Sequence, residues 1–139
     1  MKAVYLRSLV LLLLPLGGLS AFEREVVFNE DFTVLRFEEC EYPLAARLSG
    51  VQGMVVLEVS YGEKGRVESV EAISGPKLLI PAALANARTW TFRPSPKGKA
   101  IILYDFRIEE TCVLPCRSQF LFRPPNVATV RIGHALIEP

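Results

Sequence analysis

Cysteine is the residue type with the clearest capacity for covalent chemistry in this chain. Its three cysteines are Cys40, Cys112 and Cys116, and an exported protein can keep disulfides. Cys112 and Cys116 would close a five-residue loop containing Pro115, and we favour this short disulfide if a tight turn makes the two Cβ vectors converge. The rival pairing joins Cys40 to either of them; it would close a far longer loop and constrain the unfolded chain more, with a total contribution of about 4 kcal/mol. A metal site is disfavoured, since neither C-x-x-C spacing nor a neighbouring histidine accompanies the cysteines.

The remaining titratable residues do not form a catalytic set. His134, the only histidine, follows Gly133 in a tail with no serine or cysteine at motif spacing. Glu38, Glu39 and Glu41 form a small acidic cluster, which solvated turn residues explain more simply than paired catalytic carboxylates. We therefore predict no enzyme activity, no metal, no cofactor and no small-molecule substrate.

The N-terminus has the pattern of a secretory signal peptide. Lys2 and Arg7 precede an apolar run at residues 9–19, which is too short to cross a bilayer comfortably as a helix. Small residues near its end fit a cleavage site, so we predict a signal peptide at 1–21 and a periplasmic mature chain. The alternative is an uncleaved leader that holds the chain at the inner membrane.

Length and charge narrow the function classes. A chain of 139 residues, of which 50% are hydrophobic, can bury one core and is too short for two ordinary domains. The mature chain lacks Lys2 and Arg7, so it has 14 of the 16 basic residues and all 15 acidic residues, which gives a net charge of −1. This balance argues against nucleic acid or an anionic membrane as a partner, because both attract a basic surface.

Alternating hydrophobicity predicts a β-hairpin in the middle of the chain. Apolar residues at every second position from 55 to 61 predict a strand at 53–61. The glycine-containing loop at 62–65 suits a hairpin, and residues 66–74 return as a second strand. Because the apolar residues of this second strand change parity, we predict a bulge near Glu68 or Ser69.

Two helices and a third strand complete the predicted core. A short helix is expected at 44–48, and an apolar stripe at three- and four-residue spacing predicts a helix from Pro81 to about Trp90. Alternation returns in a third strand at 100–109. Two further β-prone segments, 118–123 and 127–132, are separated by a pair of prolines.

These elements predict an α+β fold. It is a three-stranded antiparallel sheet in the order second, first, third, with one main helix packed on it, a short N-terminal helix and extra β-prone segments at both ends. A right-handed crossover through the main helix returns the third strand beside the first. The third strand is therefore expected at an edge of the sheet.

Several short motifs follow one another in a characteristic order. They are Tyr42-Pro43, Gly53 with apolar residues two, four, six and eight places on, Gly65-Arg-Val, Ser74-Gly75, and Trp90-Thr-Phe-Arg-Pro94. Together they resemble the C-terminal domain of TonB, the periplasmic coupling protein of outer-membrane nutrient uptake, over about residues 42–109. We accordingly divide the chain into the signal peptide, an N-terminal extension at 22–41, the TonB-like domain at 42–110 and a C-terminal extension at 111–139.

The resemblance implies a protein-binding module associated with transport across the envelope. Proteins of this kind bind an extended segment of an outer-membrane receptor, or of another envelope protein, by strand addition at an exposed sheet edge. Here the binding edge would be the backbone of eight residues: Ile101, Ile102, Leu103, Tyr104, Asp105, Phe106, Arg107 and Ile108. Tyr104 and Phe106 would pack beneath this edge and Arg107 would tune specificity. Such an edge could also pair with a second copy to form a homodimer.

The C-terminal extension suggests an alternative function. Residues 117–132 could lie along the third strand and occupy its edge, and TonB's membrane-spanning helix and proline-rich spacer have no counterpart in this sequence. The chain would then be a stand-alone envelope structural or adaptor protein whose edge strand is capped by its own tail, without energy coupling.

Overall fold

The computed structural model describes residues 32–110 and 117–134. The predicted signal peptide and the cysteines at 112 and 116 lie outside these residues. The elements, in chain order, are β1 (Val34–Arg36), α1 (Leu44–Leu48), β2 (Gly53–Tyr61), β3 (Val67–Ser74), α2 (Ile80–Ala87), β4 (Thr91–Phe92), β5 (Gly98–Glu109), β6 (Gln119–Arg123) and β7 (Val127–Gly133). No helix within the described ranges is long and apolar enough to span a membrane.

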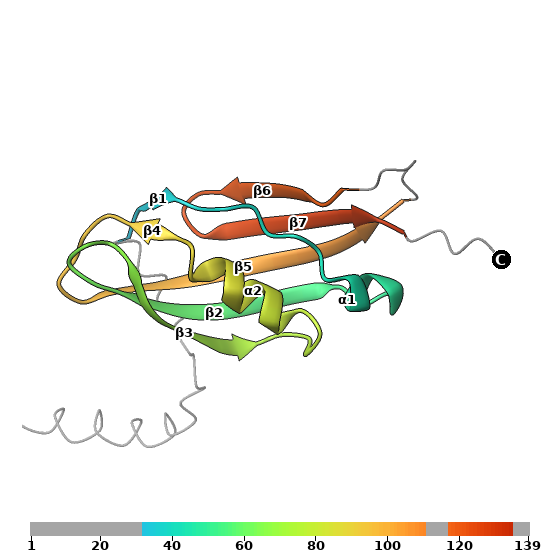
Figure 1. Cartoon of the computed structure of the whole chain (residues 1–139), viewed down its shortest axis with the longest axis horizontal. Coiled ribbons are helices and arrows are strands. Elements are labelled where there is room, and N and C mark those ends of the chain that lie inside the picture. The colour runs from blue at the N-terminus through green and yellow to red at the C-terminus, as the bar shows by residue number, and fades with distance from the viewer. Residues whose placement is uncertain (1–31, 111–116, 135–139) are drawn as a thin grey trace, which may run out of the picture.

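The main sheet has five strands in the order β3-β2-β5-β7-β6, and β1 and β4 form a separate two-stranded pair (Figure 1). The predicted α+β class is confirmed, and β3-β2-β5 reproduces the predicted order of the first three strands. The predicted three-stranded limit is wrong, as is the edge position of the third strand. The physical reason is the C-terminal extension: β7 pairs in parallel with β5, and β6 pairs antiparallel with β7.

The β2–β3 hairpin forms as the alternation predicts. Its register changes from Ser60↔Ser69 to Tyr61↔Val67, which leaves Glu68 as the extra residue and confirms the predicted bulge. Gly65 has a φ of 72° in the hairpin loop. A Cβ there would collide with the carbonyl oxygen of Phe92, so this position requires glycine.

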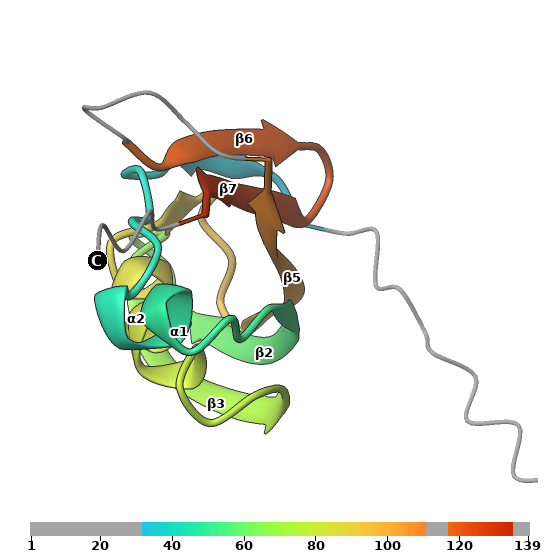
Figure 2. The same cartoon turned by 90° about the vertical axis from the view of Figure 1, so that its right-hand side faces the viewer.

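The main sheet curves around the helices and the N-terminal segment that cover one of its faces (Figure 2). Its helix face, which we define by the buried alternate side chains of β2, β5 and β7, packs against the helices and the N-terminal segment. Helix α2 covers the β2–β3 side, and residues 32–43 pass over the β7–β6 side. The core of this layer includes Trp90, Phe92, Tyr104 and Phe106, each at most 1% exposed.

Helix α2 is shorter than the predicted 81–90. It ends at Ala87, and the amides of Thr89 and Trp90 turn back onto the carbonyls of Asn86 and Ala87. This turn leaves Trp90 outside the helix but 1% exposed in the core. Helix α1 covers the predicted residues 44–48.

Candidate functional site

The predicted binding strand lies inside the sheet. β5 pairs with β2 from Gly98↔Tyr61 to Phe106↔Gly53. Its other side pairs with β7 from Leu103↔Val127 to Glu109↔Gly133. The prediction that the backbone of residues 101–108 forms an open edge is therefore wrong in this structure, because the chain's own β7 takes the place that a partner segment would need.

Asn126 fixes the start of the β5–β7 pairing. Its side-chain Nδ2 donates to the carbonyl of Ile101 at 3.0 Å, and its own carbonyl accepts from the amide of Leu103 at 2.9 Å. Asn126 is 5% exposed, so both bonds are sheltered from water and set the register. The sequence prediction missed this residue; its position directly after Pro124-Pro125 is the signal that could have indicated a strand-starting turn.

The predicted side-chain positions on β5 divide between the two faces. Tyr104 and Phe106 are completely buried on the helix face, beneath the strand as predicted. Arg107 is exposed on the opposite face, where its Nε donates to Asp105 Oδ2 at 2.7 Å. Whether Arg107 tunes specificity stays a prediction.

Arg107 lies beside Arg131 of β7 in the parallel register. Each arginine forms an ion pair with a carboxylate. Arg107 pairs with Asp105, and Arg131 pairs with Glu109, with 3.4 Å between Arg131 Nε and Glu109 Oε1. The second contact is an ion pair without hydrogen-bond geometry, because Arg131 Nε has no hydrogen-bond partner. Alternating charge therefore keeps the two arginines compatible side by side.

A single asparagine ties the helix layer to the sheet. Asn86 Oδ1 accepts from Trp90 Nε1 at 2.9 Å and from the Tyr104 hydroxyl at 2.8 Å. Its Nδ2 donates to the carbonyl of Glu38 at 2.9 Å. Burial raises the pKa of Tyr104, with a smaller contribution from the charge of Cys40, so this phenol stays protonated and donates.

Cys40 is a free, buried thiol. Its Sγ contacts the carbonyls of Glu41 at 3.6 Å and Ala82 at 3.9 Å. Burial raises the pKa of Cys40 to about 12, and the charge of Glu41 adds to the effect. Such a thiol is a poor nucleophile near neutral pH. The disulfide predicted between Cys112 and Cys116 lies outside the described residues.

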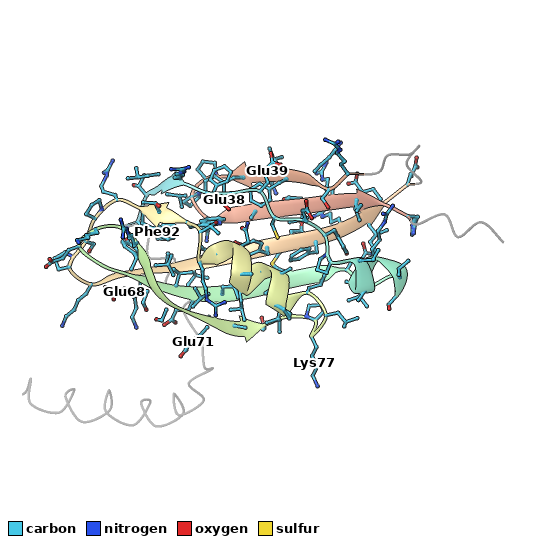
Figure 3. All side chains as sticks on the ribbon, viewed as in Figure 1. Glu38, Glu39, Glu68, Glu71, Lys77 and Phe92 are labelled. Carbon is cyan, nitrogen blue, oxygen red and sulfur yellow. The ribbon has the colours of Figure 1, made fainter. Side chains whose placement is uncertain are left out.

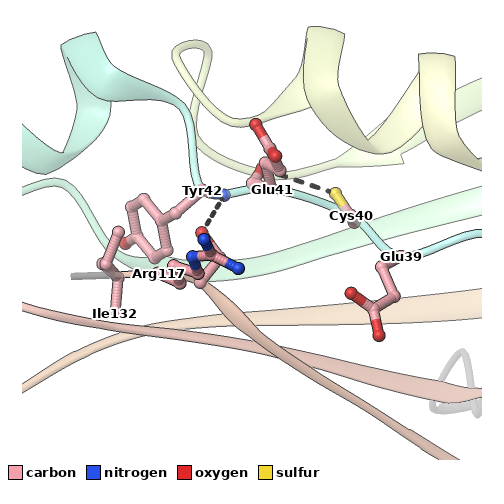
Figure 4. A pocket seen from close by; sticks show the side chains of 7 residues that line it. Glu39, Cys40, Glu41, Tyr42, Arg117 and Ile132 are labelled. Carbon is pink, nitrogen blue, oxygen red and sulfur yellow. Dashed lines mark hydrogen bonds between the residues drawn. The ribbon is translucent and has the colours of Figure 1, made fainter. Parts of the chain in front are cut away.

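A cavity of about 440 Å³ lies where the N-terminal segment meets the C-terminal hairpin (Figure 4). Its lining residues are Glu39, Cys40, Glu41, Tyr42, Arg117, Ser118 and Ile132. The Tyr42 amide donates to Ser118 Oγ at 2.8 Å and so joins the two segments. Burial raises the pKa of Tyr42 to about 12. No group of three or more His, Cys, Asp or Glu side chains that could hold a metal ion occurs within 32–110 or 117–134.

β3 and β6 form the two outer edges of the main sheet in the described part of the chain. β3 is protected against pairing: its register shifts at Glu68 and near Ile73, and its carboxylates Glu68 and Glu71 lie along it (Figure 3). β6 has none of these features. Its register with β7 is unbroken from Gln119↔Arg131 to Arg123↔Val127, and it carries no carboxylate.

Apolar and aromatic side chains surround β6. Phe37 of the N-terminal segment packs on Phe120 at 5.5 Å and on Phe122 at 5.0 Å between ring centroids. Phe37 remains 37% exposed, and Leu121, on the face away from the helices, is 50% exposed. An unprotected strand edge with exposed apolar neighbours is suited to pairing with another extended chain.

Comparisons with known proteins agree with this fold. The family described as the C-terminal region of the Gram-negative bacterial TonB protein matches residues 38–109, slightly more than half of the chain. The solution NMR structure of the Pseudomonas aeruginosa TonB C-terminal domain is similar, with 20% sequence identity and a TM-score of 0.50 over 59% of this chain and 91% of that one. A search of curated proteins returned no match. The chain belongs to the TonB C-terminal domain family.

Proposed function

We propose that this chain is a periplasmic protein-binding module, without enzyme activity, that docks an extended segment of an outer-membrane or other envelope protein by β-strand addition. Its family consists of envelope-associated interaction domains connected with transport. The observation that carries the proposal is the edge of β6, which pairs with one strand only among residues 32–110 and 117–134 and has exposed apolar neighbours. Strand addition there would use main-chain hydrogen bonds for affinity.

The docking edge is assigned to β6 because β7 is built into the core. Ala128 and Val130 are completely buried and Ile132 is 7% exposed, while Arg47 Nε donates to the carbonyl of Gly133 at 2.9 Å. Burying a Val or Ile side chain contributes about 1.5–3 kcal/mol. Removing β7 would therefore cost a large part of the roughly 5–15 kcal/mol that holds a domain together. A partner is not expected to displace it from β5.

The side chains of β6 indicate which partner segment would fit. Gln119, Leu121 and Arg123 alternate along the face away from the helices, with apolar Leu121 at the centre. Arg123 has no ion pair with any described residue. A segment with an apolar residue beside Leu121 and a carboxylate near Arg123 would complement this strand.

Strand addition can be tested by titrating the isotope-labelled chain with synthetic peptides from the periplasm-facing segments of outer-membrane receptors. The proposal predicts that a bound peptide shifts the amide signals of residues 119–123 and slows their hydrogen exchange. Leu121→Lys should weaken binding, since a charged edge residue opposes pairing. Met54→Lys is the matched control, because Met54 is 46% exposed and lies in the same cross-strand row on interior β2. No shift with any receptor peptide, or shifts confined to β3, would contradict the proposal.

A second candidate is the stand-alone envelope adaptor whose tail caps β5. The pairing of β7 with β5 favours it. Truncation after Thr111 separates the two, with folding checked by circular dichroism. If the tail only caps β5, the shortened chain should gain affinity for receptor peptides. If partners dock on β6, the shortened chain should lose affinity for them. Asn126→Ala is a milder variant, because it removes only the hydrogen bond from the side-chain amide to the carbonyl of Ile101 at the start of β7.

A further inference from the structure

Three arginines gather on the outer side of the small sheet formed by β1 and β4. Thr91 of β4 pairs with Arg36 of β1 on one side and forms an isolated bridge with Arg66 on the other. Directly paired side chains share one face of a sheet, and alternation adds Arg93, two residues beyond Thr91. Phe92 points the opposite way and is completely buried. The arginine face, which we define as Arg36, Arg66 and Arg93, therefore points to solvent, and all three residues are exposed.

The arginine face rests on a backbone that is fixed to the core. The amide of Phe92 donates to the carbonyl of Gly65 at 2.7 Å, and the amide of Arg93 donates to the carbonyl of Thr33 at 2.8 Å. The ring of Phe92 stacks on that of Tyr61, with 4.4 Å between the centroids. The three arginines thus start from one supported platform, and their guanidinium groups can reach a common ligand.

No carboxylate forms an ion pair with the arginine face within residues 32–110 and 117–134. The ion pairs of that part of the chain belong to Lys99, Arg107 and Arg131. A guanidinium group is a planar fork of five donors that matches the oxygens of a phosphate. Three such groups side by side form a surface that is suited to phosphate groups.

The charge balance of the whole chain does not describe this surface. Lys64 adds to the basic residues around β4, and it lines a cavity with Arg66 and with the carboxylates Glu63 and Glu68. Arg36 and Arg93 lie on the far side of Thr91 from Arg66, away from that cavity. The net charge of −1, which argued against an anionic membrane, is therefore an average that conceals a local basic field.

An exposed leucine lies beside the arginines. The register of β1 with β4 shifts between Val34 and Arg36, which makes Leu35 the extra residue of a bulge. Val34 packs against the core, whereas Leu35 is 58% exposed. An apolar side chain among basic groups suits the boundary of a bilayer, where the cations meet lipid phosphates and the apolar group enters between the head groups. We propose that the arginine face and Leu35 dock this domain on an anionic phospholipid membrane.

This membrane contact is independent of the docking edge proposed above. β1 and β4 form a sheet separate from the one that contains β6 (Figure 1), so docking on lipid uses none of the main-chain groups of the β6 edge. Lipid binding is measured without receptor peptides, and either proposal can fail while the other stands.

The test is co-sedimentation of the chain, purified from the periplasm, with vesicles of equimolar phosphatidylcholine and phosphatidylglycerol. The proposal predicts binding that weakens as salt is raised and that is much weaker on vesicles of phosphatidylcholine alone. Replacing Arg36, Arg66 or Arg93 by Gln should lower the partition coefficient about fivefold each, and the triple variant should lower it about a hundredfold. Leu35→Ala should weaken binding without changing its salt dependence.

Lys77→Gln is the matched control, because Lys77 is an exposed basic residue well separated from Phe92 (Figure 3); it should bind as the parent does. Circular dichroism checks that every variant is folded. Equal binding to both kinds of vesicle, parental binding by the triple arginine variant or by Leu35→Ala, or an equal loss in Lys77→Gln would overturn the inference. Binding of a poly-glutamate peptide without binding to vesicles would also overturn it and would assign the arginine face to an acidic protein.

Discussion

Asn86 is predicted to be one of the most sensitive positions in the domain. Its side chain connects three parts of the molecule, because it accepts from Trp90 and Tyr104 and donates to the carbonyl of Glu38. Asn86 is 7% exposed, Trp90 is 1% exposed and Tyr104 is completely buried. Asn86→Ala would leave the indole N–H and the phenol O–H without an acceptor in a site with little access to water.

The expected cost follows from the two orphaned donors. Each buried donor left without a partner costs about 1–3 kcal/mol, so Asn86→Ala should lower the free energy of unfolding by about 2–6 kcal/mol. Tyr104→Phe removes one of the donors. In that background Asn86→Ala should cost only about 1–3 kcal/mol, because the indole alone loses its acceptor. The difference between the two backgrounds is the coupling energy of the Asn86–Tyr104 pair.

The measurement is urea denaturation of four chains: the parent, Asn86→Ala, Tyr104→Phe and the double variant. Unfolding is monitored by the fluorescence of Trp90, the only tryptophan, and by circular dichroism. Arg88→Ala, an exposed change one residue beyond the helix, is the control and should stay within about 0.5 kcal/mol of the parent. An Asn86→Ala chain as stable as this control, or strictly additive effects of Asn86→Ala and Tyr104→Phe, would refute the reasoning.

Three further outcomes are expected from the same denaturation assay. Gly65→Ala should destabilise the domain by at least about 2 kcal/mol, because the left-handed φ and the contact with the Phe92 carbonyl both oppose a Cβ; a neutral effect would contradict the assigned hairpin geometry. Val130→Ala should cost about 2 kcal/mol within a single cooperative transition, whereas a separate early transition would mean that β7 is an independent appendage. Because the pKa of Cys40 rises on folding from 9.0 to about 12, the unfolded chain loses this proton first, so stability should fall as pH rises from about 9 toward 12. Cys40→Ala should reduce that slope, and an unchanged slope would contradict the buried position of the thiol.

The parts of the fold that were predictable are those fixed by local patterns. Alternation over 53–61 and 100–109 defined β2 and most of β5, and the parity change defined the bulge at Glu68. The two β-prone tail segments also became β6 and β7. These features depend on which face of a strand is buried, and this information is present in the sequence of the strand itself.

The position of the tail beside β5 was predicted only as an alternative, and the pairing of β7 with β5 confirms that alternative. No residue of 127–133 specifies whether it lies beside β5 or at the far side of β6, since both arrangements bury the same alternate side chains. Asn86 was missed because the helix pattern was defined by apolar residues alone. Its spacing of three from Ala83 and four from Trp90 places it on the buried stripe, and this was the available signal that it would be a buried polar connection.

Amide hydrogen exchange along β5 tests the central claim most directly, namely that β7 closes this strand and moves the open edge of the sheet to β6. The Leu103 amide donates toward the β7 side, so by alternation the amides of Asp105 and Arg107 also point to β7, while those of Tyr104 and Phe106 point to β2. The account predicts that Asp105 and Arg107 exchange as slowly as Tyr104 and Phe106. Rapid exchange of Asp105 and Arg107 beside slow exchange of Tyr104 and Phe106 would show that β5 is an open edge and contradict the account.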